Sequence, residues 1–315
     1  MGSDKIRRRI ERMMMDEEES NIGESGKINE FEQWTILGDG CFIPSPKSIK
    51  SLNSGLYDVK WSNKISDWCL EKQPFNTDEL FELPTPEIEE IINDMKIFWE
   101  KRETYKSFGL IHKRGILLYG DPGCGKSGIL QICIKHLIEK LNGVVINLKD
   151  VDSIKAYVEI IPKFRQIEPE RPLVVIIEDI DSVADDDNYS TSVLLNILDG
   201  VKQIENVVYM ATTNYPERLA ERITNRPSRF DRRYYISPPD SNIRKSYLKE
   251  KIKGTNIEID IEKWVKDTEN LSISHLKELF ISVVVLDNPY DKSLQHICGM
   301  KKSPKRKNKN IGFNN

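Results

Sequence analysis

The sequence predicts an α/β fold with a doubly wound parallel sheet, preceded by a small strand-rich domain and followed by a small helical domain. Three observations support this prediction. Between residues 85 and 238, short apolar runs alternate with segments of helical periodicity, as in a parallel sheet covered on both faces. A glycine-rich segment, Gly120–Ser127, lies between one apolar run and the helical segment after it. Beyond Pro239 the apolar residues recur only at helical spacing.

The first 84 residues divide into a terminal segment and a strand-rich region. Residues 1–25 combine basic and acidic runs with few apolar side chains other than methionine. We therefore expect a disordered or frayed tail, with a charged helix docking on a neighbour as the alternative. Residues 26–84 hold short apolar and aromatic pieces, such as Trp34–Leu37 and Cys41–Ile43, separated by glycine and proline. This pattern predicts a small strand-rich domain without a chemical motif.

The region 85–238 is expected to begin with a helix and to contribute five strands. Thr85-Pro86-Glu87 has the composition of a helix start, with proline at the first helical position. The predicted strands cover residues 115–119, 144–148, 173–177, 207–211 and 234–236, and the predicted helices between them cover 127–141, a segment ending at about 166, and 185–200. Because 173–177 is apolar throughout, we place it in the middle of the sheet.

The chain after Pro238-Pro239-Asp240 is predicted to form helices and then a tail. Residues 239–296 carry two apolar stripes at helical spacing, one including Tyr247 and Leu248 and the other including Leu276 and Leu279. They are expected to form a small helical domain. Residues 297–315 include six cations between Lys301 and Lys309 and no acidic residue there, and we expect a basic disordered tail.

The glycine-rich segment has the pattern of a phosphate-binding loop. It reads Gly-Asp-Pro-Gly-Cys-Gly-Lys-Ser and fits G-x-x-x-x-G-K-[ST], in the expected place between a strand and a helix. Its glycines permit a tight turn that points backbone N–H groups inward, and the helix N-terminus adds partial positive charge. Lys126 is suited to the β- and γ-phosphates of a nucleotide, and the Ser127 hydroxyl is suited to Mg²⁺.

Polar side chains follow two of the predicted strands. Glu178, Asp179 and Asp181 come directly after the strand at 173–177, and Asn214 follows the strand at 207–211. In an open α/β sheet, the crevice at the carboxyl ends of the strands is where ligands bind. We therefore expect the acids to meet Mg²⁺ and the γ-phosphate.

Taken together, these motifs resemble the AAA family of the AAA+ ATPases over about residues 86–290. Three motifs of the sheet region carry the resemblance: the phosphate-binding loop with the segment from Gly109 that leads into it, the acidic strand end at 178–181, and Asn214 at the place of the family's sensor 1. The segment Arg226-Pro-Ser-Arg229-Phe-Asp231 is similar to the family's second region of homology, which carries two arginine fingers. The helical domain is similar to the family's lid.

The resemblance implies an ATP-driven ring, usually a hexamer, with ATP and Mg²⁺ bound where subunits meet. It implies that the nucleotide is held by Asp121, Pro122, Gly123, Cys124, Gly125, Lys126, Ser127 and Gly128, and that Ser127 and Glu178 hold the metal. It assigns Asp179 to the attacking water and Asn214 to the water or the γ-phosphate. Arg226 and Arg229 would reach the γ-phosphate of the next subunit, where cations stabilise the charge of the transferring phosphoryl group.

Three features depart from the family's pattern. The acidic pair is Glu178-Asp179 instead of Asp-Glu; this order resembles the subfamily that includes the mitochondrial Rieske-protein assembly factor. Lys149-Asp150-Val151 stands where threading unfoldases carry an aromatic pore loop, which argues against peptide threading. Ser274-His275 stands where many AAA+ relatives outside the AAA subfamily carry an arginine.

Composition limits the partners and the compartment. The net charge of −3 over 315 residues provides no global basic field for nucleic acid. The five cysteines are scattered, which favours reduced thiols and a cytoplasmic location. The apolar runs are shorter than a bilayer span, so we expect no membrane partner.

The leading functional prediction is an ATPase ring that remodels a macromolecule, with a protein as the expected substrate. A DNA- or RNA-directed motor or loader is the alternative, supported by the basic tail at 297–315, because clustered cations neutralise phosphates. The other alternative is a nucleotide-dependent structural ring with little turnover.

Overall fold

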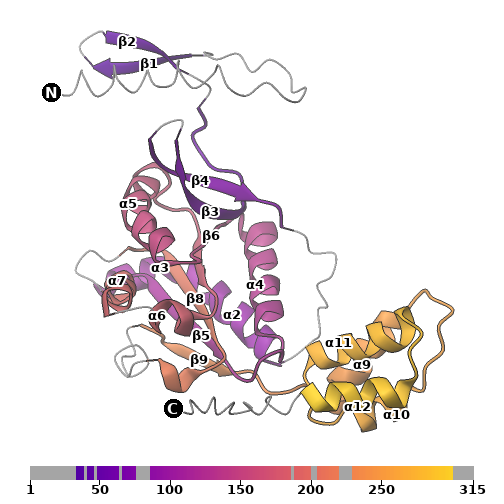
Figure 1. The fold of residues 1–315 in the computed structure, drawn as a ribbon. Helices are drawn as coiled ribbons and strands as arrows, with labels where there is room; N and C mark the ends of the chain where they lie inside the picture. Colours follow the sequence, from indigo (N-terminus) through magenta and orange to yellow (C-terminus); the bar gives the residue numbers. More distant parts are fainter. Residues whose placement is uncertain are drawn as a thin grey trace, which may run out of the picture.

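A seven-stranded sheet forms the centre of the fold (Figure 1). Its strand order is β4-β3-β6-β7-β8-β5-β9. The strands are β3 (Gly55–Ser62), β4 (Asp67–Gln73), β5 (Lys113–Tyr119), β6 (Val144–Asn147), β7 (Leu173–Ile177), β8 (Val207–Thr213) and β9 (Arg232–Tyr235). Neighbouring strands pair in parallel except β3 and β4, which are antiparallel. The predicted doubly wound α/β fold is therefore confirmed.

The computed structural model describes residues 33–38, 41–45, 48–63, 66–75, 86–185, 188–199, 204–219 and 229–300. The predicted tail at 1–25, most of the predicted tail at 297–315, and Arg226 lie outside these ranges. A second sheet pairs only β1 (Gln33–Gly38) with β2 (Cys41–Ser45).

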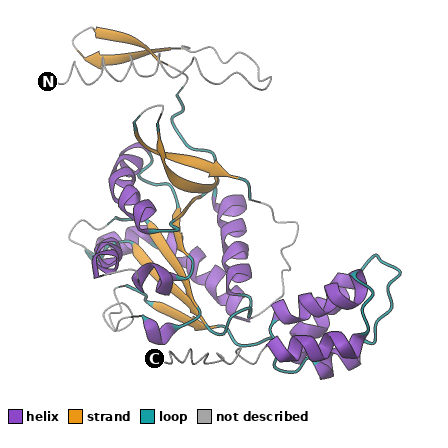
Figure 2. Ribbon diagram, viewed as in Figure 1, coloured by secondary structure: helices purple, strands orange, loops and turns teal. Residues whose placement is uncertain are grey.

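Helices cover both faces of the main sheet (Figure 2). One face packs against α5 (Val151–Ile167), α6 (Ile180–Asp185) and α7 (Asn188–Asp199), and the other against α2 (Pro86–Glu100) and α4 (Lys126–Leu141). Successive strand residues point to opposite faces. Val175 and Tyr209 accordingly lie in the first core, whereas Val174 and Met210 lie in the second. This double burial explains why the central strands are apolar throughout.

The C-terminal part is a separate helical layer. It contains α9 (Ser241–Ile252), α10 (Ile261–Asp267), α11 (Ile273–Phe280), a π-helical turn (Ile281–Val285) and α12 (Tyr290–Met300), and these elements share a core that includes Leu248, Leu276 and Leu279. The predicted helical domain is thus present, with its last helix ending at Met300. Within the described residues, no helix has the length and hydropathy to span a bilayer.

The predicted boundary at residue 84 differs from the structure. β3 pairs in parallel with β6, with Gly55 opposite Val144 and Asp58 opposite Asn147, and β4 then extends the sheet beyond β3. The strands at 55–73 therefore belong to the sheet of the 85–238 domain and not to an independent N-terminal domain. The cause is the pairing of β3 with β6, which are far apart in the chain because β3 precedes α4 and β6 follows it. The composition of the strands does not reveal this pairing.

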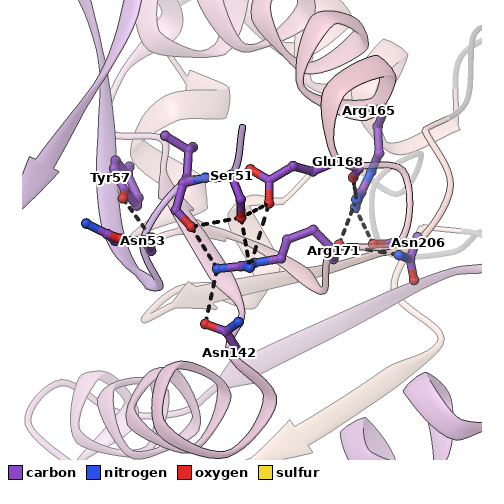
Figure 3. Close-up of polar contacts among 9 residues, drawn as sticks. Ser51, Asn53, Tyr57, Asn142, Arg165, Glu168, Arg171 and Asn206 are labelled. Atoms are coloured by element: carbon purple, nitrogen blue, oxygen red, sulfur yellow. Dashed lines mark hydrogen bonds and ion pairs between the residues drawn. The ribbon is translucent and has the colours of Figure 1, made fainter. Parts of the chain in front are cut away.

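A polar network fixes the chain that leads into β3 (Figure 3). The Leu52 N–H donates to Glu168 Oε1 at 2.8 Å, and Leu52 O accepts from Arg171 Nη2 at 2.9 Å. Arg171 and Glu168 are themselves an ion pair, with 3.7 Å between Nη1 and Oε2. Ser51 Oγ adds a hydrogen bond of 2.8 Å to Glu168. Both backbone groups of Leu52 are therefore satisfied by the turn after α5, which holds β3 against the sheet.

Candidate nucleotide-binding and hydrolysis site

The phosphate-binding loop joins β5 to α4, as predicted. Gly123 and Gly125 have φ values of 78° and 103°, in the region that side-chain-bearing residues rarely adopt. Gly120 is required for a different reason, because a Cβ there would lie 2.2 Å from the backbone oxygen of Ile236. The glycines thus allow both the turn of the loop and the close passage of the chain that follows β9. Asp121, Pro122 and Ser127 are exposed, while Cys124 is buried.

Lys126 is held by the loop itself. Its side chain is buried, and Nζ donates to the backbone oxygens of Gly120 at 2.7 Å and Asp121 at 2.9 Å. Burial lowers the pKa of this ammonium group, and nearby carboxylates partly offset the effect. The loop therefore positions one cation at the N-terminus of α4, where the helix dipole adds to its field.

Ser127 and Glu178 meet at the first turn of α4. Ser127 Oγ donates to Glu178 Oε2 at 2.9 Å, although the two residues are 51 positions apart. A hydroxyl and a carboxylate are hard oxygen donors of the kind that Mg²⁺ prefers, with phosphates and water completing its shell. The predicted metal pair is therefore brought together, and its donor set fits Mg²⁺.

Asp179 and Asn214 meet at the ends of the adjacent strands β7 and β8. Asn214 Nδ2 donates to Asp179 Oδ1 at 3.0 Å. Asp179 has a φ of 46°, an uncommon value for a residue other than glycine, and its N–H donates to Thr212 Oγ1 at 3.0 Å. Such conformations concentrate at functional sites. The end of β8 thus fixes both the backbone and the side chain of Asp179.

Thr212 and Thr213 are site residues that the sequence interpretation missed. Thr212 supports Asp179, and Thr213 Oγ1 donates to the buried Asp181 Oδ1 at 2.6 Å. The available signal was their position at the end of an apolar strand, directly before Asn214. Asp181 is therefore a buried carboxylate that is hydrogen-bonded within the chain.

The helical layer contacts the phosphate-binding loop. The Ser274 N–H and Oγ both lie 3.4 Å from the backbone oxygen of Gly123. Ser272 caps α11, and its Oγ lies 2.6 Å from His275 Nδ1. A Cβ at Gly123 would approach Ser272 Oγ to 2.7 Å. The N-terminus of α11 therefore forms one wall of the site.

The structure does not bring Arg229 to the loop of its own chain. Its side chain is buried, with 3.6 Å between Nε and Asp199 Oδ2 at the end of α7. The following Asp231 accepts from the Gly115 N–H at 2.9 Å. Arg229 thus has a partner inside its own chain, which the expected role as an arginine finger for the next subunit did not include.

Comparison with known proteins agrees with this geometry. The model of the family described as "ATPase family associated with various cellular activities (AAA)" matches residues 116–238. This domain belongs to the AAA family of ATPases. The match extends from β5, which leads into the phosphate-binding loop, past β9, and thus includes Lys126, Glu178, Asp179 and Asn214. The resemblance stated from the motifs is confirmed.

Three relatives show how far the similarity extends. The ATPase family gene 2 protein of Saccharomyces cerevisiae is 33% identical over 196 residues, which are 55% of this chain and 24% of that protein. A cell division cycle protein 48 homolog of Archaeoglobus fulgidus is 30% identical over 186 residues, 54% of this chain and 25% of that protein. The ATP-dependent zinc metalloprotease FtsH 2 of Salinibacter ruber is 24% identical over 259 residues, 76% of this chain and 37% of that protein. The chain spans about a quarter of the length of the first two AAA relatives.

Proposed function

We propose that this AAA chain binds ATP with Mg²⁺ and hydrolyses it, acting in an oligomeric ring, with a hexamer expected, that remodels a protein substrate. The observation that carries the hydrolytic part is the convergence of two pairs. Ser127 meets Glu178, and Asn214 meets Asp179, at the carboxyl ends of neighbouring strands beside Lys126. A charge for the phosphates, a donor set for the metal and a carboxylate for water are thus present together.

The binding half of the proposal assigns the phosphates to the loop. Lys126 and the backbone N–H groups at the start of α4 bind the β- and γ-phosphates, and Ser127 and Glu178 hold Mg²⁺. Bound Mg²⁺ supplies a Lewis acid that neutralises charge on the phosphate oxygens. The contact of α11 with Gly123 makes the helical layer sensitive to whatever occupies the loop.

The hydrolytic half assigns the water to Asp179. Its carboxylate accepts the proton of the attacking water, and Asn214 holds that carboxylate in one orientation. The exposure of Glu178 and Asp179 leaves this side of the site open to solvent and nucleotide.

The support for ring assembly and for a protein substrate comes from the relatives. One is named an ATP-dependent metalloprotease and another a cell division cycle protein 48 homolog. Arg226 is proposed to act across a subunit interface, whereas Arg229 is buried beside Asp199 of its own chain. Within residues 26–84, the hairpin of β1 and β2, which pair with each other outside the main sheet, is the proposed place of substrate recognition. The absence of an aromatic residue from Lys149-Asp150-Val151 favours remodelling without threading.

The test is Lys126→Ala, measured by phosphate release from Mg²⁺-ATP. We expect hydrolysis to be abolished, while circular dichroism and thermal unfolding show a folded chain. Lys140→Ala is the matched control, because it removes an exposed cation from the last turn of the same helix. Near-normal turnover in Lys126→Ala would refute the assignment.

A further inference from the structure

A cavity of about 300 Å³ lies at the carboxyl ends of β3 and β6, beside the first turn of α5. The residues that line it belong to β3, β4, β6, the loop into α5 and the first turn of α5, and none belongs to the phosphate-binding loop. Figure 1 shows β3 and β4 beside α5. The carboxyl ends of parallel strands are the usual ligand-binding edge of such folds, and the volume matches small pockets.

The lining of this cavity has an excess of negative charge. It contains the carboxylates of Asp58, Glu71, Asp150 and Asp152 and the ammonium groups of Lys60 and Lys149. Both cations are already paired: Lys149 Nζ lies 2.6 Å from Asp58 Oδ2, and Lys60 Nζ lies 2.9 Å from Glu71 Oε1. The other oxygen of Asp58 is buried and has no hydrogen-bond donor among the described residues. A buried carboxylate oxygen of this kind favours a cationic ligand, because it lacks its full set of donors.

Two tryptophans add a second cation-binding feature. Trp61 and Trp68 are cross-strand partners, with ring centroids 5.3 Å apart and planes at 82°. Trp61 remains 46% exposed, so one part of its ring is open to a ligand. The face of an indole ring attracts a lysine or arginine head group. Carboxylates beside an exposed indole form a site suited to a basic side chain.

We propose that this cavity binds a lysine or arginine side chain of the chain's own basic segment, Lys301–Lys309, from the same or a neighbouring copy. The segment has six cations in nine residues and no acid, which complements the negative lining. It begins directly after Met300, where α12 ends. Its charge, opposite to that of the lining, selects this segment as the occupant. The site is distinct from the nucleotide site and does not depend on ATP hydrolysis.

The test uses a fluorescein-labelled peptide with the sequence of residues 301–309. The receptor is the full-length chain with glutamine at the six cationic tail positions, Lys301, Lys302, Lys305, Arg306, Lys307 and Lys309. We expect fluorescence anisotropy to show binding that high salt weakens. A peptide with glutamine at all six positions should not bind. Wild-type chain should bind the labelled peptide several-fold more weakly, because its own segment competes.

Substitutions of acidic and basic residues in the cavity should change the affinity for the peptide in opposite directions. Asp58→Asn should weaken peptide binding about fivefold, and Trp61→Ala should weaken it about threefold. Lys149→Ala should strengthen binding, because it releases Asp58 from its internal partner. An anionic ligand would reverse the signs of Asp58→Asn and Lys149→Ala. Glu269→Gln is the control, since it makes the same charge change at an exposed position in the helical layer.

Three outcomes overturn the proposal. The peptide could fail to bind the receptor, or it could bind equally to Asp58→Asn, Trp61→Ala and the parent, which would place the basic segment elsewhere. Equal binding to the wild-type and neutral-tail chains would assign the cavity to a basic segment of another protein. Thermal unfolding of each variant identifies any that fails to fold. If Asp58→Asn does not fold, Trp61→Ala provides the test in its place, because Trp61 is half exposed and its substitution should leave the fold intact.

Discussion

Asn214 Nδ2 and Asp179 Oδ1 are joined by a hydrogen bond of 3.0 Å between the ends of two adjacent strands. The bond engages one carboxylate oxygen of Asp179, and in the proposed mechanism the other oxygen acts on water. Thr212 holds the backbone of Asp179 in its left-handed conformation at the same time. The two acids have different partners, because Glu178 accepts a hydrogen bond from Ser127.

The first prediction concerns Asp179→Asn. The amide keeps the size of the side chain and removes the proton acceptor, so we expect kcat to fall about 10²- to 10⁴-fold with little change in ATP affinity. Phosphate release and titration with a fluorescent ATP analogue measure the two effects. Loss of ATP binding in proportion to turnover would show that Asp179 supports the nucleotide and not the water.

The second prediction concerns Glu178→Gln and the metal. Glu178 accepts a hydrogen bond from the Ser127 hydroxyl, and both side chains are proposed to hold Mg²⁺. Replacing the Glu178 carboxylate with a neutral amide should therefore raise the Mg²⁺ concentration needed for half-maximal activity about tenfold or more. A Mg²⁺ titration after treatment with a chelator measures this change. Asp179→Asn is the comparison, because its Mg²⁺ dependence of nucleotide binding should match the parent. Equal nucleotide-binding defects in both variants would contradict the division of labour.

The third prediction separates backbone strain from contact with the helical layer. Gly123 and Gly254 have similar φ values, 78° and 74°, so alanine is strained at both by about 1–2 kcal/mol. Only at Gly123 would the new Cβ meet another group, Ser272 Oγ at 2.7 Å. Gly123→Ala should therefore weaken ATP binding about tenfold or more, whereas Gly254→Ala should lower stability and leave ATP affinity unchanged. Equal ATP affinities in the two variants would show that the contact with α11 does not shape the site.

The sequence predicts the centre of this protein better than its edge. The strand at 173–177 is found with the predicted bounds, and Lys126, Ser127, Glu178, Asp179 and Asn214 lie where strand–loop patterns place them. These features follow from local periodicity and from the geometry of parallel strand ends. The addition of β3 to the sheet does not, because it depends on pairing Gly55 with Val144, far along the chain.

The sequence also does not predict which side chains contact one another. Nothing in the segment Arg226–Asp231 indicates that Arg229 pairs with Asp199, thirty positions earlier on a helix. Nor does the sequence show that the Thr212 hydroxyl, just after the predicted strand at 207–211, accepts a hydrogen bond from the Asp179 N–H. Both contacts join neighbouring elements whose register is fixed only by the packed core.

The fourth prediction concerns stability at Arg229. Its buried ion pair with Asp199 means that Arg229→Ala leaves a largely buried carboxylate without its partner. We expect the free energy of unfolding to fall by about 3 kcal/mol, which urea denaturation would measure. Arg229→Ala is therefore unsuitable as a test of an arginine finger, because loss of activity would follow from either cause. An unchanged unfolding midpoint would show that the pair contributes nothing to the fold.

The last prediction concerns assembly and uses Arg226. If Arg226 acts on the nucleotide of a neighbour, Arg226→Ala should bind ATP like the parent and lose turnover by about 10³-fold or more. Lys126→Ala inactivates the other part of this composite site, the phosphate-binding loop. Mixing the two inactive variants should restore some activity, because some interfaces then join an intact phosphate-binding loop to an intact arginine. Hydrolysis by the parent should also rise more than linearly with protein concentration. If size measurements confirm mixed assemblies and the mixture stays as inactive as its parts, Arg226 does not act between subunits.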